Sequence, residues 1–172
     1  KFDAEGRYTG IGPDYLRILH KMTGLSFRIA PPSDWTNTID MATSHKVDMY
    51  IAAAETQHRS QYMLSTPSYI VLPGIIVTRQ PTKGESVTRG AATDETEPSI
   101  DGIKDLAGKR VAVVNRYSWH DFLEELHPEI TPVPVKNTLE GLQKVAFGEV
   151  DAMIDYQFNI TEKINNSGIR NL

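Results

Sequence analysis

Apolar runs of strand type alternate with amphipathic helical patterns along the whole chain. The run Val47–Ala54 is short, apolar and rich in strand-forming residues, which is typical of a buried parallel strand. The segment Val150–Ile154 repeats its V-D-x-x-I pattern in the second half of the chain, and an amphipathic helical pattern precedes each copy. We interpret this repeat as a sign of two related lobes with a cleft between them.

The other expected strands and helices follow from the spacing of apolar residues and from the turn residues at their ends. Strands are expected at Phe27–Ala30, Met63–Leu64, Tyr69–Thr78, Arg110–Val114 and Ile130–Val135. Three helices are expected at Pro13–Gly24, Ser99–Gly108 and Tyr156–Asn166. Three more are expected to follow a cap residue: one after Ser33 or Asp34, one after Ser118, and one after Asn137 or Thr138. The alternation predicts an α/β fold with mostly parallel sheets.

Two stretches depart from this regular alternation. Gln80–Pro98 is polar and has no periodicity, so we expect it to form a loop. Pro132 and Pro134 lie within the strand expected at Ile130–Val135. Because proline donates no backbone hydrogen bond, that strand is expected at the edge of its sheet.

Composition excludes several classes of function. The chain has 172 residues, 40% of them hydrophobic, and a net charge of -4. An acidic chain without a basic stripe cannot neutralise many phosphates, which argues against a nucleic-acid partner. The absence of cysteine removes disulfides, thiolate catalysis and cysteine zinc sites. The five histidines lack metal-ligand spacing, and no phosphate-binding or catalytic-serine motif occurs, so we expect no metal and no cofactor.

The sequence also limits what can be said about location. No apolar run approaches the roughly 20 residues that a membrane helix needs. Lys1–Gly6 is polar and turn-like rather than a signal peptide, and we expect the chain to be cut from a longer protein. Composition by itself fits a cytosolic compartment as well as an oxidising one.

A series of motifs along the chain carries a resemblance to a known family. In the first half they are Gly10 and Asp14 in G-I-G-P-D-Y-L, Trp35 in S-D-W, K-V-D-M-Y-I-A, the turn that ends at Arg59, and S-T-P-S-Y at 65–69. In the second half they are I-K-D-L-A-G-K-R-V-A-V at 103–113, L-E-G-L-Q-K-V-A at 139–146 and G-E-V-D-A at 148–152. In order and spacing, the chain resembles the type II periplasmic solute-binding proteins of family 3, the amino-acid-type Venus-flytrap domains.

The resemblance implies a two-lobed fold that lacks a segment at each end. The family's first strand, with an aromatic residue that stacks on the ligand, would precede Lys1, and the return segment to the first lobe would follow Leu172. The segment Asp48–Arg59 also looks one residue shorter than in the binding proteins of amino-acid transporters. That shorter form is similar to the sensor domains of membrane-bound hybrid histidine kinases.

The resemblance places lobe 1 at residues 1–76 and lobe 2 at 77–172, with 69–78 as the first hinge crossing. It implies a periplasmic or extracytoplasmic, non-enzymatic domain that closes around an amino-acid-like or carboxylate ligand. Such a domain would be the sensor module of a signalling protein, with a membrane-bound kinase as its partner. The alternatives are the solute-binding component of an ABC transporter, a dehydratase-type or transglycosylase-associated enzyme domain, and a structural piece that another chain completes.

In the first lobe, Arg59 is the main candidate for ligand binding. The resemblance implies that its guanidinium forks onto a ligand carboxylate, whereas the plain alternative is a surface arginine in a polar turn. Glu55 can pair with Arg59, select a cationic ligand group or act as a general acid. Burial of Glu55 in a cleft would favour an enzyme, and an outward, solvated Glu55 would favour a binding module. Trp35 and Tyr69 can each line the cleft or pack in the core.

In the second lobe, the candidates lie where strands end and helices begin. Tyr117 and Ser118 follow a predicted strand, at a helix start where backbone amides can bind an anion, although capping alone explains Ser118. Arg116 stands where the family usually has a glycine. The resemblance puts Asp155 one position before the family aspartate that holds an amino group, so that Tyr156 occupies the matching position.

Overall fold

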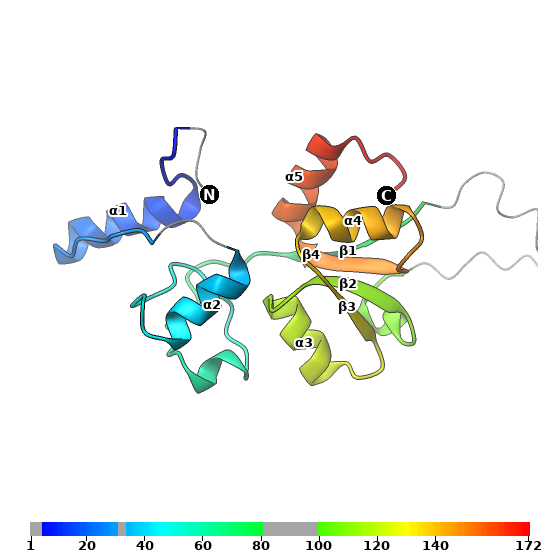
Figure 1. Cartoon of the computed structure of the whole chain (residues 1–172), viewed down its shortest axis with the longest axis horizontal. Helices are drawn as coiled ribbons and strands as arrows, with labels where there is room; N and C mark the ends of the chain where they lie inside the picture. Colours follow the sequence, from blue (N-terminus) through cyan, green and yellow to red (C-terminus); the bar gives the residue numbers. More distant parts are fainter. Residues whose placement is uncertain (1–4, 31–33, 81–99) are drawn as a thin grey trace, which may run out of the picture. The chain divides into compact units, whose positions relative to one another are not determined.

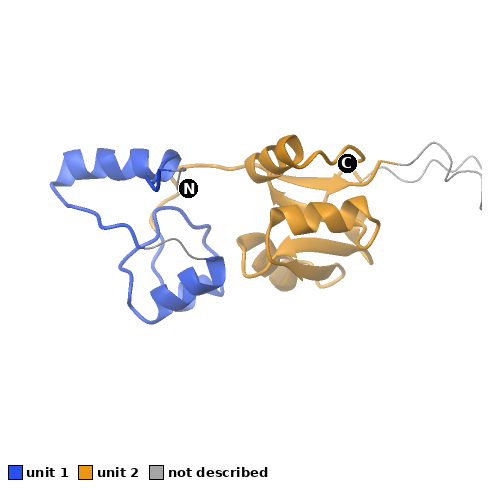
Figure 2. Cartoon of the chain, turned by 45° about the horizontal axis from the view of Figure 1, so that its top comes forward, with its two compact units in different colours: residues 1–65 blue, residues 66–172 orange. Residues whose placement is uncertain are grey.

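A computed structural model describes residues 5–30, 34–80 and 100–172 of the chain. These residues belong to two compact units, Lys1–Ser65 and Thr66–Leu172 (Figure 2). Apart from Gln80, the loop expected at Gln80–Pro98 lies outside the described residues. The caps expected at Ser33 and Ser99 lie outside them as well. We describe each unit by itself.

Unit 1 contains two α-helices and a short 3-10 helix. Helix α1 spans Ile11–Thr23, and the backbone N–H of Gly24, in the left-handed conformation, closes it by donating to the His20 carbonyl. Helix α2 spans Trp35–Thr43, and the Asp34 side chain caps it by accepting the backbone N–H of Asn37 at 2.8 Å. The 3-10 helix η1 spans Arg59–Gln61. The predicted positions of α1 and α2, and the predicted cap at Asp34, are confirmed.

The strands predicted in unit 1 are wrong. Val47–Ala54 and Phe27–Ala30 form no strand, and neither does Met63–Leu64; the residues of Val47–Ala54 are half-buried or exposed. A strand persists only where a neighbouring strand satisfies its backbone N–H and C=O groups. The described part of unit 1 contains no such neighbour, so apolar composition alone does not produce a strand here. The repeated V-D-x-x-I pattern therefore marks a strand in the second copy alone.

Unit 2 is built on a four-stranded mixed sheet (Figure 1). Its strands are β1 (Gly74–Thr78), β2 (Arg110–Val114), β3 (Thr131–Val135) and β4 (Ala152–Tyr156), in the order β1-β4-β2-β3. Strands β2, β3 and β4 are parallel, and β1 runs antiparallel to β4. The strand predictions in this half are confirmed, including the edge position of the proline-containing β3, although β1 takes up only the second half of Tyr69–Thr78.

Helices cover both faces of this sheet. They are η3 (Ile103–Leu106), α3 (Ser118–Leu126), α4 (Thr138–Ala146) and α5 (Gln157–Ser167). Figure 1 shows α4 and α5 on one side of the sheet and α3 on the other. The predicted cap of α4 at Asn137 is confirmed, because its side chain accepts the Glu140 N–H. The predicted cap of α3 at Ser118 is wrong: Tyr117 holds the capping position with an extended backbone, and Ser118 is the first helical residue.

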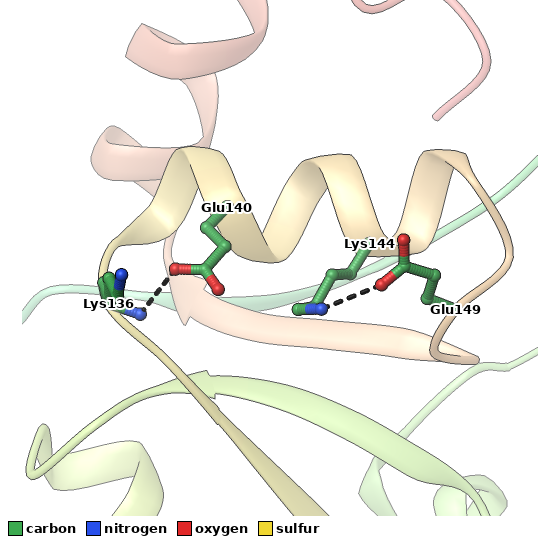
Figure 3. Close-up of polar contacts among 4 residues, drawn as sticks. All are labelled: Lys136, Glu140, Lys144 and Glu149. Atoms are coloured by element: carbon green, nitrogen blue, oxygen red, sulfur yellow. Dashed lines mark hydrogen bonds and ion pairs between the residues drawn. The ribbon is translucent and has the colours of Figure 1, made fainter.

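Helix α4 carries local polar contacts at both ends (Figure 3). At its start, the Glu140 carboxylate accepts the backbone N–H of Lys136 at 2.9 Å. Beyond its end, the Lys144 ammonium donates to Glu149 at 2.8 Å, and this hydrogen bond raises the pKa of Lys144. These contacts fix the two ends of the helix.

Side chains from each strand alternate between two hydrophobic clusters, one on each face of the sheet. The cluster on the α3 side contains Leu106, Val111, Val113, Leu123, Ile130, Ala152 and Ile154. The cluster on the side of α4 and α5 contains Val77, Ala112, Val114, Val135, Leu142, Val145, Val150, Met153 and Ile160. This alternation decides which face each residue at the end of β4 meets. The described part of unit 1 has no comparable cluster, and Ile39 is its one buried aliphatic side chain.

Gly74, the first residue of β1, lies against the indole ring of Trp119. A Cβ atom at position 74 would come within 2.0 Å of a ring carbon of Trp119, so the site has no room for a methyl group. We predict that Gly74→Ala lowers the free energy of unfolding of unit 2 by about 1–3 kcal/mol through overpacking. Urea unfolding in a Trp35→Phe background measures it, because Trp119 is then the remaining tryptophan and its fluorescence follows unit 2.

The matched control is Gly102→Ala. A Cβ atom at position 102 meets nothing within 4 Å, and the extended backbone there suits any residue. We expect this control to leave the urea midpoint nearly unchanged. Equal stability of the two variants would show that the ring of Trp119 does not occupy the space over Gly74.

Candidate functional site

The turn from β2 to α3, residues 115–118, is held in a defined conformation by its backbone and by one side chain. Arg116 has φ 60, in the left-handed region that favours glycine, which accounts for the glycine expected at this position in the family. Its backbone N–H donates to Nδ1 of His120 at 3.1 Å. The N–H of Asn115 donates to the Val135 carbonyl, which ties the turn to the neighbouring strand β3. The turn is therefore a fixed surface at the carboxyl end of the sheet.

Asp155, near the end of β4, is the centre of a buried polar network. It is 1% exposed. One carboxylate oxygen accepts the hydroxyl of Thr138 at 2.6 Å. The other accepts the backbone N–H of Tyr156 at 2.7 Å and the side-chain amide of Asn159 at 3.1 Å. The network joins β4 to the first residues of α4 and α5, and its donors compensate the burial of the carboxylate.

Tyr156 presents its side chain on the opposite face of the sheet from Asp155. Its hydroxyl forms a hydrogen bond of 2.8 Å with the hydroxyl of Ser118, the first residue of α3. Its ring lies 5.9 Å from that of Trp119 and is stacked at 6.4 Å with that of Phe158. The strand alternation thus sends the Asp155 carboxylate toward α4 and α5, and the Tyr156 hydroxyl toward the turn at 115–118.

Tyr117 lies beside this network, packed partly against the cluster on the side of α4 and α5. Burial raises the pKa of its phenol, and the nearby Asp155 and Tyr156 raise it further, because each disfavours a negative charge at this position. Tyr117 is therefore held in its neutral, hydrogen-bond-donating form. The structure thus brings the three second-lobe candidates Tyr117, Ser118 and Asp155 to one end of the unit 2 sheet.

In unit 1, Arg59 is buried rather than exposed on a polar turn. It is 3% exposed, and its guanidinium donates to the Ala54 carbonyl at 2.9 Å. The guanidinium carbon lies 5.2 Å from the centroid of the Trp35 ring, in cation–π contact. The Trp35 ring in turn lies 5.6 Å from that of Tyr50, whose hydroxyl donates to the Thr38 carbonyl. The sequence candidates Arg59 and Trp35 therefore form one stacked group with Tyr50.

The remaining two candidates from the first half of the chain, Glu55 and Tyr69, are exposed. Glu55 is exposed, and no hydrogen bond or ion pair joins it to Arg59 or to any other described residue. Tyr69 is 42% exposed and belongs to unit 2, in the segment before β1. The proposed salt bridge of Glu55 with Arg59 is thus not formed.

Several residues of these groups were not candidates at the sequence level. Thr138 was considered as a possible helix cap, Tyr50 was quoted only as part of the K-V-D-M-Y-I-A motif, and Asn159 carried no signal. Their roles depend on partners that are distant in the sequence, as with Thr138 and Asp155, which are 17 residues apart. Among the described residues, no three histidine, aspartate or glutamate side chains are placed to hold a metal ion. Within the same ranges, every helix is too short or too polar to cross a membrane.

Comparison with known proteins connects this geometry to a family. The family model of the bacterial extracellular solute-binding proteins, family 3, matches residues 1–116. The sensor protein EvgS of Escherichia coli (strain K12) is 24% identical over 157 residues, which are 91% of this chain and 12% of EvgS. The crystal structure of the periplasmic VFT2 domain of Bordetella pertussis BvgS is 24% identical with a TM-score of 0.67 and covers 92% of this chain. An ancestral arginine-binding protein bound to arginine is 20% identical with a TM-score of 0.70 and covers 97% of this chain.

The likeness to these solved structures shows the fold, which is that of the Venus-flytrap, periplasmic-binding-like domains. The chain spans 61% of the VFT2 domain, 68% of the ancestral arginine-binding protein and 12% of EvgS. The predicted α/β, Venus-flytrap fold is confirmed.

The Asp155 network yields a stability prediction. Thr138→Val keeps the shape of the side chain but removes the hydroxyl donor from one oxygen of the buried carboxylate. We expect the free energy of unfolding of unit 2 to fall by about 1–3 kcal/mol, because a buried acceptor loses its partner. The matched control is Thr131→Val on the edge strand β3, where the threonine is exposed and the change should stay within about 0.5 kcal/mol. Equal effects at the two positions would contradict the network.

The raised pKa of Tyr117 predicts a pH dependence. Its contribution to stability is fully present below the unfolded-state pKa of about 10. It is lost as the pH rises through the higher folded-state pKa, because the unfolded chain releases this proton first. Between about pH 9 and pH 11, the stability of the wild type should therefore fall more steeply than that of Tyr117→Phe. Urea titrations at several pH values test this, with the exposed Tyr69→Phe as control; identical slopes for all three would contradict it.

Proposed function

The chain belongs to family 3 of the bacterial extracellular solute-binding proteins, and from this premise we propose that it is the ligand-binding sensor module of a membrane-bound signalling protein. The observation that carries the proposal is the match of 91% of the chain to the sensor protein EvgS. The short Asp48–Arg59 segment, which resembles that of kinase sensor domains, supports the same choice. The kinase partner and the ligand are part of the proposal.

The extracytoplasmic location implied by the resemblance agrees with the family and with its relatives. The family is described as extracellular, and the BvgS VFT2 domain is described as periplasmic. In the ABC-transporter alternative, the domain would deliver its solute to a permease. The ancestral arginine-binding protein gives that alternative its support, since it binds an amino acid on the same fold.

Arg59 is proposed as the anchor of the ligand's anionic end. Its guanidinium is oriented by the Ala54 carbonyl and by the ring of Trp35, so little side-chain entropy remains to be lost on binding. Because it is 3% exposed, water screens its charge only weakly, which strengthens the attraction for a carboxylate. Planar, two-pronged donation suits a carboxylate better than any point charge does.

We propose a binding role without catalysis. Glu55 was the one residue that the sequence offered as a catalytic acid, and it is exposed. A carboxyl group that acts as a general acid near neutral pH normally needs burial in a cleft beside a specific partner. Glu55 has neither, so the binding module is the better account.

Thermal unfolding with and without a panel of amino acids and small carboxylates tests the proposed function. A ligand at about a hundred times its dissociation constant should stabilise the chain by about 2.7 kcal/mol. Arg59→Lys keeps the charge but loses the two-pronged contact, and we expect it to weaken binding about tenfold or more. Calorimetry of both proteins gives the dissociation constants, and far-UV circular dichroism verifies folding.

Arg17→Lys in α1 is the matched control. Arg17 is an exposed arginine of the same unit that pairs with Asp14, so its exchange for lysine should leave ligand affinity unchanged. If no compound in the panel binds, the solute-binding proposal fails. If a compound binds equally well to wild type and Arg59→Lys, the anchor lies elsewhere.

A further inference from the structure

We propose that His120 is a pH-sensitive latch on the turn between β2 and α3: the neutral imidazole holds the turn in its observed conformation, and protonation releases it. The latch lies within unit 2 and is independent of the proposed ligand. It depends on two features of this unit, the hydrogen bond that one ring nitrogen of His120 accepts and a backbone conformation in the turn that favours glycine.

The contacts of His120 assign its tautomer. Nδ1 accepts the backbone N–H of Arg116 at 3.1 Å, so this nitrogen carries no hydrogen. The hydrogen of the neutral ring therefore lies on Nε2, which is 3.4 Å from the Glu124 carboxylate. The His120 side chain is 12% exposed, so little water is available to replace the contact at Nδ1.

Protonation of His120 adds a hydrogen at Nδ1, the nitrogen that has to accept. The imidazolium is a donor at both nitrogens, so its Nδ1–H and the Arg116 N–H would point at each other. Glu124 attracts the cation, but it lies at Nε2, where the neutral ring already carries a hydrogen. It therefore cannot restore the hydrogen bond that is lost at Nδ1, and the Arg116 amide and the ring have to separate.

The turn is strained where His120 holds it. Arg116 has φ 60 and is the third residue of a turn that the Tyr117 N–H closes by donating to the Val114 carbonyl at 3.0 Å. This position favours glycine, because a residue with a Cβ atom is strained at positive φ. The hydrogen bond to His120 helps to offset that strain. Tyr117 and Ser118 follow directly, so a change in the turn also changes their positions.

The groups around His120 leave the pH dependence to His120 itself. The cluster that α3 covers consists of aliphatic and aromatic residues without titratable groups. The charged residues close to His120 are Glu124, which faces Nε2, Asp121 in the first turn of α3, and Arg116 in the turn. Carboxylates and guanidinium groups ordinarily keep their charge between about pH 5 and pH 8, whereas histidine changes its charge in that range.

His127, the residue that caps the other end of α3, is the matched control. Its Nδ1 forms a hydrogen bond of 2.9 Å with the Glu129 carboxylate, and this contact lowers the pKa of Glu129. Because a carboxylate accepts, Nδ1 of His127 donates, and protonation of this ring removes no acceptor. We expect His127→Asn to leave the behaviour of the Arg116 amide as it is in the wild type.

NMR on the whole chain without ligand tests the latch, with ring nitrogen shifts for the protonation of His120 and amide hydrogen exchange for the turn. Between about pH 7.5 and about pH 5, protection of the Arg116 amide, corrected for the intrinsic pH dependence of exchange, should fall about tenfold or more as His120 is protonated. His120→Asn places an amide oxygen near the position of Nδ1. This acceptor does not titrate, so Arg116 should stay protected at both pH values.

His120→Phe keeps a ring but has no acceptor, and its Arg116 amide should be weakly protected at both pH values. A wild-type Arg116 amide that stays equally protected while His120 titrates would overturn the latch. Failure of His120 to take up a proton in the folded chain down to about pH 5 would overturn it as well. Because no ligand is present, neither result bears on the proposed solute binding.

Discussion

The buried carboxylate of Asp155 is the constraint on which unit 2 depends. A carboxylate with 1% exposure is stable only if donors replace the water that it has lost, and three donors do so here. Thr138 and Asn159 belong to the first turns of α4 and α5, whose N-terminal dipoles also favour a negative charge. One side chain therefore sets where two helices begin relative to the end of β4.

This constraint has a consequence on the other face of the sheet. Because successive residues of a strand point to opposite faces, fixing Asp155 toward α4 and α5 directs Tyr156 toward α3. There it meets Ser118 and the ring of Trp119, and Trp119 in turn fills the space over Gly74. Gly74 is the partner of Tyr156 in the β1–β4 register. The ring of Trp119 thus connects the Ser118–Tyr156 pair to β1, the strand through which the chain enters the sheet.

The sequence was a good guide to unit 2 and a poor one to the strands of unit 1. In unit 2, apolar character and packing agree: Val111–Val114 of β2 is apolar, and β2 is also flanked by β3 and β4. Val47–Ala54 has a similar apolar character but pairs with no strand among the described residues, and it stays irregular. Propensity identifies a segment that can be a strand, whereas only tertiary pairing makes it one.

The candidate site shows the same limit at the level of single residues. Serine is common at the capping position of helices, but Tyr117 takes that position in α3. The Ser118 hydroxyl forms a hydrogen bond with the Tyr156 hydroxyl instead. Arg59 was expected either to bind a ligand or to lie on the surface, and its burial against Trp35 could not be read from the chain. The resemblance offered Asp155 as the candidate, one position before the family aspartate, with Tyr156 at the matching position, and a shift of one residue along a strand exchanges the two faces.

Amide hydrogen exchange followed by NMR tests the central claim most directly. The backbone N–H of Tyr156 donates to the buried Asp155 carboxylate, and that of Gly102 donates to the carboxylate of Asp105 at the surface. If the Asp155 network is as described, the Tyr156 amide exchanges only through unfolding of unit 2. Its opening free energy should then equal that of core amides such as Val113. Exchange of Tyr156 by local opening, as fast as that of Gly102, would show an Asp155 carboxylate that is free to turn, and would contradict the account.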